Sequence, residues 1–137
     1  MPKVGAVLES ALYVDDLPEA AAFYKRLFGF PRLFANDNLV AFDVSGRSVL
    51  LLFRRGGSAS QQETPGGVIP GHDGHGPLHV AFSIENDALQ TWIDRLAGEG
   101  VALESRMEWP LGGTSVYFRD PDGHLLELVT RRVWPTY

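Results

Sequence analysis

One carboxylate in this sequence lies where a charge is costly. Glu127 is the only charged residue in the run Leu125-Leu126-Glu127-Leu128-Val129. The two-residue period of a strand puts it on the same face as Leu125 and Val129. A lone ionised carboxylate in such surroundings is expensive to bury. Either this face opens on solvent, as in an edge strand with one wet position, or a partner such as a bound cation neutralises the charge.

An internal repeat places Glu127 in a wider pattern. The stretch from Phe42 to Phe53 has the same order of features as the stretch from Phe118 to Val129. Each has an aromatic strand end, a glycine turn and a short apolar strand. When the two stretches are aligned, Leu51 corresponds to Glu127. The two stretches are therefore equivalent strands of two copies of one unit.

A second pair of stretches completes the repeat. The strand-like run from Glu9 to Val14 and the run from His79 to Ile84 each precede a helical segment, and Glu9 falls on His79. Three of the four equivalent positions therefore carry side chains that bind metals. Two carboxylates and one imidazole suit a divalent ion such as Mn, Fe, Ni, Mg or Zn. Such a site leaves positions for water or for a substrate that presents two adjacent oxygens.

The composition excludes several classes of protein. A chain of 137 residues with a net charge of −5 is long enough for one compact domain, and it has no basic cluster of the kind that neutralises nucleic-acid phosphates. It has no cysteine, which excludes thiolate catalysis, disulfides and cysteine-ligated zinc. No apolar run approaches the roughly 20 residues that span a bilayer. We expect a cytoplasmic protein that binds no nucleic acid and no membrane.

The first copy reads as strand, helix and three strands, over about residues 4–55. A strand is predicted from Val4 to Val14, and Asp15-Asp16 offers an N-cap for the helix that follows. Gly29 is placed to end this helix. From Phe30 to Phe53 the pattern changes to short strands separated by turn residues.

The crossing between the copies, about residues 56–77, is rich in glycine and proline and is predicted to be loop. His72 and His75 in this segment could bind a metal. A solvated, flexible crossing is favoured instead, because nothing rigid in the sequence holds either ring.

The second copy, about residues 78–130, repeats the same order. A strand begins at Leu78, and the last two strands form a hairpin from Thr114 to Thr130. His124, beside the hairpin turn, is predicted to be exposed. The aromatic tail 131–137 is expected to dock rather than to remain free. Between the first strand and the hairpin, a helix is predicted over Ala88 to Ala97 and a strand over Val101 to Glu108.

The chain resembles the vicinal oxygen chelate superfamily, the glyoxalase, bleomycin resistance protein and extradiol dioxygenase group. This resemblance implies an α+β fold in which two βαβββ modules form a curved eight-stranded mixed sheet around a pocket, in a single domain over residues 1–137. It also implies a homodimer. The residues that carry it are Leu12-Tyr13-Val14-Asp15-Asp16-Leu17, Leu27-Phe28-Gly29-Phe30, Leu78-His79-Val80-Ala81-Phe82 and Phe118-Arg119-Asp120-Pro121-Asp122-Gly123-His124-Leu125-Leu126-Glu127-Leu128.

Carried over by position, the resemblance makes Glu9, His79 and Glu127 the metal ligands, with Leu51 at the remaining ligand position. Because Leu51 cannot ligate, the four-ligand site of glyoxalase I is absent, and classical glyoxalase I activity is not expected. The three-ligand arrangement implies a metal-dependent lyase, isomerase or dioxygenase. Glu127 and Tyr13 are the predicted catalytic residues.

A metal-free alternative stays open. The pocket could instead hold an aromatic drug-like ligand, as in a bleomycin-resistance-like sequestering protein. In either case the predicted pocket residues are Tyr13, Leu51, Phe53, Trp109 and Tyr117.

Each candidate ligand also has an ordinary structural explanation. Glu9 could face solvent, His79 could be a core histidine, and Glu127 could pair with Arg47 or Arg119.

Overall fold

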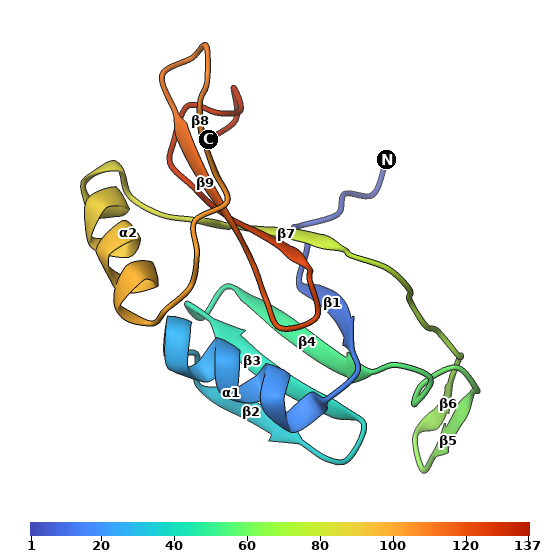
Figure 1. The fold of residues 1–137 in the computed structure, drawn as a ribbon. Helices are drawn as coiled ribbons and strands as arrows, with labels where there is room; N and C mark the ends of the chain where they lie inside the picture. Colours follow the sequence, from blue (N-terminus) through green and yellow to red (C-terminus); the bar gives the residue numbers. More distant parts are fainter. The chain divides into compact units, whose positions relative to one another are not determined.

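The computed structural model describes all 137 residues, which form two compact units, Met1–Gly76 and Pro77–Tyr137. Each unit contains one βαβββ module, as Figure 1 shows. The predicted α+β fold of two such modules is confirmed, and the strands of each module form a four-stranded sheet of their own. The first module comprises β1 (Glu9–Val14), α1 (Leu17–Phe28), β2 (Arg32–Ala35), β3 (Leu39–Val44) and β4 (Ser48–Arg54).

The second module repeats this order after the crossing. It comprises β7 (His79–Ser83), a 3-10 turn η1 (Asn86–Ala88), α2 (Leu89–Gly98), β8 (Ser105–Glu108), β9 (Thr114–Arg119) and β10 (Leu125–Val129). Neither helix is long and apolar enough to cross a membrane.

The two sheets have the same topology. The first has the order β1-β4-β3-β2 and the second the order β7-β10-β9-β8. In each, the first strand of the module pairs in parallel with the last, and the other pairs are antiparallel. The last strand of each module is therefore interior to its sheet, and its side chains have neighbours on both sides.

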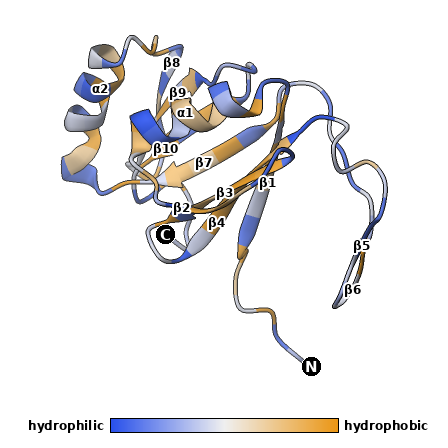
Figure 2. Ribbon diagram, turned by 90° about the horizontal axis from the view of Figure 1, so that it is seen from below, coloured by the Kyte–Doolittle hydropathy of each residue, from blue (hydrophilic) through white to orange (hydrophobic).

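Helix α1 forms where capping and apolar spacing agree. Asp16 accepts a hydrogen bond from the backbone N–H of Glu19 at 3.0 Å, and Gly29 ends the helix with φ of 70°. One face of α1 is buried, while its other residues are exposed. Figure 2 shows this division as two colours along α1, whereas β3 and β4 are mostly apolar. The buried residues of α1 are Leu17, Ala20, Phe23, Tyr24 and Leu27.

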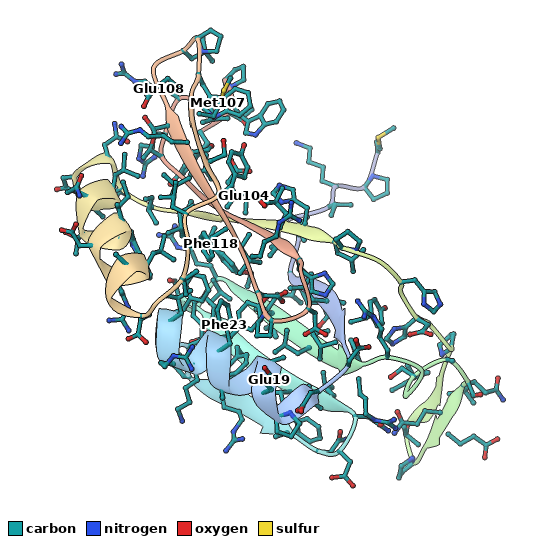
Figure 3. All side chains as sticks on the ribbon, viewed as in Figure 1. Glu19, Phe23, Glu104, Met107, Glu108 and Phe118 are labelled. Atoms are coloured by element: carbon teal, nitrogen blue, oxygen red, sulfur yellow. The ribbon has the colours of Figure 1, made fainter.

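On the interior strands β9 and β10, the face of the C-terminal sheet opposite Glu127 is apolar and buried. Four side chains of that face are no more than 1 % exposed: Val116, Phe118, Leu126 and Leu128. Strand β8 lies at the edge, and the β8–β9 hairpin reaches out to Met107 and Glu108, both exposed and labelled in Figure 3. Glu127, on the other face, is also buried, at 7 % exposure, so its carboxylate needs a polar partner there.

The structure differs from the sequence prediction in the crossing and at the start of the first strand. The crossing is not all loop, because β5 (Gln62–Thr64) and β6 (Gly67–Ile69) form a short antiparallel hairpin within it. The first strand begins at Glu9 rather than Val4, and before it only the Leu8 carbonyl, which accepts a hydrogen bond from the Val49 amide at 2.8 Å, is joined to the sheet. The tail does dock, because the Gly113 amide donates to the Arg132 carbonyl at 3.1 Å and Arg131 pairs with Glu85, but Trp134 takes no part and is 70 % exposed. The Tyr137 ring lies under the Arg131 guanidinium, 4.7 Å from ring centroid to Cζ.

The Asp16 cap gives a stability prediction. Substituting Asp16→Ala removes the acceptor for the Glu19 amide and should lower the free energy of unfolding by about 1 kcal/mol. Urea unfolding monitored by circular dichroism measures the change. Asp37→Ala, at an exposed turn position without a capping contact, is the control and should change the free energy by less than about 0.5 kcal/mol. Equal effects of the two substitutions would show that the cap contributes nothing.

Candidate functional site

Glu127 is buried, at 7 % exposure, on the interior strand β10 of the C-terminal sheet. Its carboxylate is engaged from both neighbouring strands. Ser115 on β9 donates a hydrogen bond from Oγ to Glu127 Oε2 at 2.5 Å, and His79 on β7 places Nε2 3.3 Å from Glu127 Oε1. The pairing with Arg119 that the sequence left open is wrong, because Arg119 forms an ion pair with Glu104.

The His79 ring is oriented by the main chain. Its Nδ1 lies 2.8 Å from the carbonyl oxygen of Leu125, and a carbonyl oxygen only accepts, so Nδ1 carries a proton. In the neutral imidazole, Nε2 then has a lone pair directed at the Glu127 carboxylate. Two states fit this geometry: a cation held between Nε2 and Oε1, or an imidazolium that donates to Glu127. Since the His79 side chain is 50 % exposed, the pair is open to solvent on that side.

Trp109 and Ser115 fix the direction of this network. The indole Nε1–H of Trp109 donates to Ser115 Oγ at 2.8 Å. Because an indole N–H is only a donor, the Ser115 hydroxyl must direct its own proton elsewhere, to Glu127 Oε2. Ser115 is 0 % exposed. The sequence did not single it out, although its alternation with Tyr117 on the strand paired with β10 was a usable signal.

Tyr117 lies directly opposite Glu127 in the antiparallel pair of β9 and β10. Burial raises the pKa of the Tyr117 hydroxyl above its ordinary value of 10.0, and the negative charge of Glu127 raises it further. Tyr117 therefore stays protonated beside the carboxylate near neutral pH. Trp109 and Tyr117, both predicted pocket residues, accordingly lie around Glu127 in the C-terminal unit.

The N-terminal unit holds the other predicted residues around a cavity of about 720 Å³. Glu9, Leu51 and Phe53 line it together with residues of the crossing. Glu9 is exposed at the start of β1. The volume lies within the range of small-molecule sites.

Tyr13 and His72 form a polar pair beside this cavity. The Tyr13 hydroxyl lies 2.7 Å from His72 Nδ1, and the Tyr13 ring stacks on Phe53 at a centroid distance of 5.8 Å. The His72 ring meets Phe53 edge-on at 4.6 Å. The prediction that His72 is a solvated loop residue is therefore wrong. The prediction of a solvated histidine does fit His75, whose side chain is 87 % exposed.

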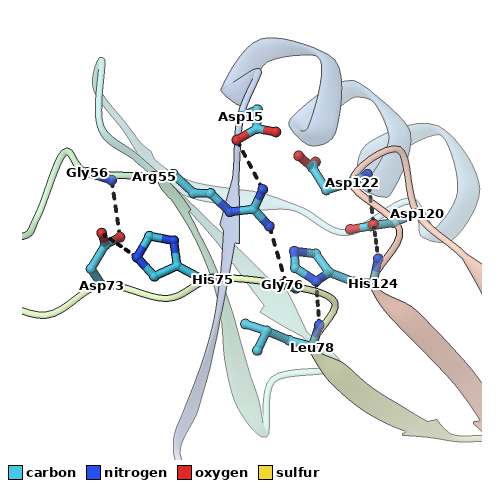
Figure 4. A network of polar contacts seen from close by, with 10 residues as sticks. All are labelled: Asp15, Arg55, Gly56, Asp73, His75, Gly76, Leu78, Asp120, Asp122 and His124. Carbon is cyan, nitrogen blue, oxygen red and sulfur yellow. Dashed lines mark hydrogen bonds and ion pairs between the residues drawn. The ribbon is translucent and has the colours of Figure 1, made fainter.

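The crossing is anchored at several points, shown in Figure 4. Asp73 Oδ1 accepts a hydrogen bond from the Gly56 amide at 3.1 Å. Arg55 donates to Asp15 at 3.0 Å and to the Gly76 carbonyl at 3.3 Å. The amide hydrogen bonds from Gly56 and then Gly74 hold the pKa of Asp73 below its ordinary value of 3.8. These contacts hold the crossing beside the cavity.

His124 is fully buried, so the prediction of an exposed hairpin residue is wrong. Its Nδ1 accepts a hydrogen bond from the Leu78 amide at 2.8 Å, and its own amide donates to Asp120 Oδ1 (Figure 4). His124 thus joins the hairpin turn to the start of β7. This is a structural role rather than a catalytic one.

A second cavity of the N-terminal unit, about 400 Å³, lies between α1 and the β2–β3 strands. None of the predicted metal, catalytic or pocket residues lines it, and its walls include Leu17, Ala21 and Phe42. Asp37 is the one carboxylate in its lining, and no histidine lines it. The candidate site is therefore the set of residues around His79 and Glu127, with the larger cavity as a second binding region.

The structure gathers no group of three or more His, Asp or Glu side chains that could hold a metal. His79 and Glu127 are brought together in the C-terminal unit, while Glu9 lies in the N-terminal unit. Convergence of Glu9 with the other two stays a prediction.

Sequence comparison places the chain among known proteins. The sequence model of the Glyoxalase/Bleomycin resistance protein/Dioxygenase superfamily matches residues 6–128. The chain is 33 % identical over 122 residues to metallothiol transferase FosB of Bacillus licheniformis, covering 88 % of this chain and 72 % of that protein.

Solved structures are similar over almost the full length. The crystal structure of lactoylglutathione lyase from Agrobacterium tumefaciens superposes with a TM-score of 0.88 at 35 % identity, covering 97 % of this chain and 98 % of that one. Fosfomycin resistance protein FosX from Listeria monocytogenes, complexed with Mn(II) and sulfate, superposes with a TM-score of 0.67 at 23 % identity, covering 94 % and 91 %. The FosX likeness concerns the fold alone.

The Asp73 anchor predicts a pH dependence for the crossing. Because the pKa of Asp73 is lowered in the folded chain, its anchoring is complete above about pH 3.8 and is lost as the pH falls below that value. Hydrogen exchange should show the protection factor of the Gly56 amide falling by about 3- to 10-fold in that acid range. In Asp73→Asn the protection should be lower and independent of pH over the same range. An unchanged profile in Asp73→Asn would exclude Asp73 as the anchor.

Proposed function

This chain belongs to the Glyoxalase/Bleomycin resistance protein/Dioxygenase superfamily, and we propose that it is a metal-dependent enzyme acting on a small molecule with two neighbouring oxygens. The observation that carries the proposal is the pair His79 and Glu127. Its Nε2 and Oε1 atoms face each other at 3.3 Å, on a sheet face that is open to solvent at His79. An apolar strand retains a buried carboxylate more readily when a cation compensates its charge.

The donor atoms fit a divalent ion. With metal–ligand bonds of about 2.0–2.1 Å, neighbouring ligand atoms of one ion lie roughly 3 Å apart. The separation of 3.3 Å in this pair is close to that value. Imidazole nitrogen and carboxylate oxygen suit Mn, Fe, Ni, Mg or Zn. Because catalytic sites usually have three protein ligands, we propose Glu9 as the third.

A bound ion would act as a Lewis acid that polarises a substrate oxygen. The residues of the chain orient this chemistry. The Leu125 carbonyl holds the His79 ring, and Ser115 occupies Oε2 of Glu127, which leaves Oε1 for the ion. Since Oε2 is held by Ser115 and Oε1 faces His79 Nε2, we assign Glu127 the role of ligand. Tyr117 stays protonated beside it and helps to hold the carboxylate.

Similarity to known enzymes and the identity of Leu51 give an order in which to test three reaction types. Similarity to a metallothiol transferase makes thiol transfer the first reaction to test, and similarity to a fosfomycin resistance protein, 25 % identical over 123 residues, makes fosfomycin the first substrate. Similarity to a lactoylglutathione lyase makes the hemithioacetal of methylglyoxal and glutathione the second. Leu51 offers neither a ligand nor a base at its position, which argues against proton transfer of the glyoxalase I kind. Dioxygenase chemistry, assayed with catechol, is the third candidate.

Metal-free binding of a small molecule is the second candidate function. The cavity of about 720 Å³ in the N-terminal unit favours it, because Leu51, Phe53 and Ile69 give part of the wall an apolar character.

We also propose a homodimer. Strands β1 and β7 each lie at the edge of a four-stranded sheet. Edge strands present unpaired backbone groups that invite pairing or covering. Light scattering should give twice the chain mass of 15.1 kDa.

Metal content tests the proposed function directly. Protein purified without chelator should hold about one divalent ion per chain, measured by mass spectrometry of the elements. His79→Ala and Glu127→Ala should weaken binding at least about 100-fold, since each removes a ligand. Glu9→Ala should weaken it comparably if Glu9 is the third ligand.

Glu104→Ala is the matched control, because it removes a carboxylate of the same unit that pairs with Arg119 at the surface. It should bind the ion as the parent does. If the parent binds none of Mn, Ni or Zn after reconstitution, the metal-dependent proposal fails and small-molecule binding takes its place.

Ser115 gives a separate prediction. Ser115→Ala leaves Oε2 of Glu127 without its donor and frees the carboxylate to rotate, so the affinity for Mn should fall by about 10- to 100-fold. Calorimetric titration of metal-free protein measures this. Ser105→Ala, which removes an exposed hydroxyl on β8, should leave the affinity unchanged. Identical affinities in the two variants would contradict the role of Ser115.

A further inference from the structure

The N-terminal cavity carries a recognition group that the proposed metal chemistry does not use. His72 lines this cavity, its Nδ1 is bonded to Tyr13, and its Nε2 has no partner within the protein. We propose that His72 binds a ligand in this cavity through its Nε2–H group and that Tyr13 holds the ring in the required tautomer. The ligand would be an uncharged molecule with an apolar body and an acceptor oxygen.

The position of His72 is set before any ligand arrives. Its backbone amide donates to the Ser58 carbonyl at 2.8 Å, and its ring rests edge-on against Phe53. The neighbouring Gly74 lies directly on the Tyr13 ring, where an added Cβ would be 2.3 Å from Cδ2. Asp73 is held by the Gly56 amide. A ring held by Tyr13 and Phe53 on a tethered backbone loses little freedom when it binds a ligand, which favours affinity.

The tautomer follows from the Tyr13 contact. A phenol keeps its proton near neutral pH, and here burial raises the pKa of Tyr13 further, with Asp73's negative charge adding to the effect. We assign the Tyr13 hydroxyl as the donor in its 2.7 Å contact with His72 Nδ1, which makes Nδ1 the acceptor. The ring proton is then on Nε2, which offers a donor to a ligand oxygen. Tyr13 is thus a positioning residue, and His72 is the residue that contacts the ligand.

The charged residues that line the N-terminal cavity determine which charge a ligand can carry. Two carboxylates, Glu9 and Glu63, line the cavity, and no lysine or arginine does. In the metal-free protein, a carboxylate or phosphonate ligand would meet the like charges of Glu9 and Glu63 without a cation to compensate them. The remaining wall combines carboxamides with apolar side chains, among them Leu51 and Ile69, the latter 50 % exposed. This lining favours an uncharged, partly apolar molecule such as an aryl ketone.

Three compounds of similar shape test this selection by NMR titration of the metal-free protein. Acetophenone has an acceptor oxygen and no charge, ethylbenzene lacks the acceptor, and benzoate carries a negative charge. The parent protein should bind acetophenone about 3- to 10-fold more tightly than ethylbenzene, the contribution of one neutral hydrogen bond. It should bind benzoate weakest. Equal binding of acetophenone and ethylbenzene, or preferred binding of benzoate, would overturn the proposal.

Matched variants separate recognition from structure. His72→Phe keeps an aromatic ring against Phe53 but removes the donor, so the preference for acetophenone over ethylbenzene should disappear while ethylbenzene still binds. His75→Phe changes an exposed ring of the same segment and should alter nothing.

Tyr13 is tested through the His72 tautomer. Nitrogen-15 spectra of the parent should show His72 protonated on Nε2 and not on Nδ1, with the signal assigned by its loss in His72→Phe. Tyr13→Phe keeps the ring that stacks on Phe53, so a purely structural role would leave the spectrum unchanged. The proposal requires a mixture of tautomers in Tyr13→Phe, together with weaker acetophenone binding. A parent ring protonated on Nδ1 would refute it.

Ligand binding at His72 can be tested independently of metal binding at Glu127. Acetophenone titration of Glu127→Ala should give the same preference as the parent, because the cavity lies in the N-terminal unit. Loss of the preference in Glu127→Ala would contradict an independent site.

Discussion

Burial of the Glu127 carboxylate is the constraint to which the C-terminal unit is adapted. Because β10 is an interior strand, the Glu127 carboxylate has partners on both neighbouring strands. These are His79 on the parallel strand β7 and Ser115 on the antiparallel strand β9. Trp109 supports Ser115, and the Leu125 carbonyl supports His79. Each contact determines a proton position or a ring orientation. The sheet register therefore places His79 Nε2 and Glu127 Oε1 face to face. A pair of metal ligands requires such an arrangement of lone pairs.

The crossing illustrates how composition can mislead. Its glycines suggested a flexible, solvated connection. Gly74 is instead needed because the chain passes too close to the Tyr13 ring for a side chain, and Gly71 has the Ala59 carbonyl at 2.2 Å from a hypothetical Cβ. Glycine allows both close approach and mobility, and sequence alone does not distinguish them. The crossing is here a wall of the cavity, and His72 is part of that wall.

Membership of the superfamily limits the chemistry without choosing one reaction. Proteins similar to this chain include a thiol transferase and a lyase, so the shared fold does not determine the reaction. The choice depends on individual positions. Leu51 offers neither a ligand nor a base at the cavity wall, and Glu9 contributes a carboxylate there. Glu63 is a second carboxylate of this wall, and no lysine or arginine lines it.

The sequence alone determined the family, the two βαβββ modules, the ends of α1 and the hairpin that carries Glu127. These features depend on contacts between near neighbours or on a repeated pattern, as with Asp16 and Gly29. Only the tertiary structure decided the burial of His124, the place of His72 and the tautomer of His79. Each depends on partners 46 to 59 residues away, such as the Leu78 amide for His124 and the Tyr13 hydroxyl for His72. Local propensity and periodicity contain no record of such distant neighbours, because they arise only when the strands pair and the crossing folds back.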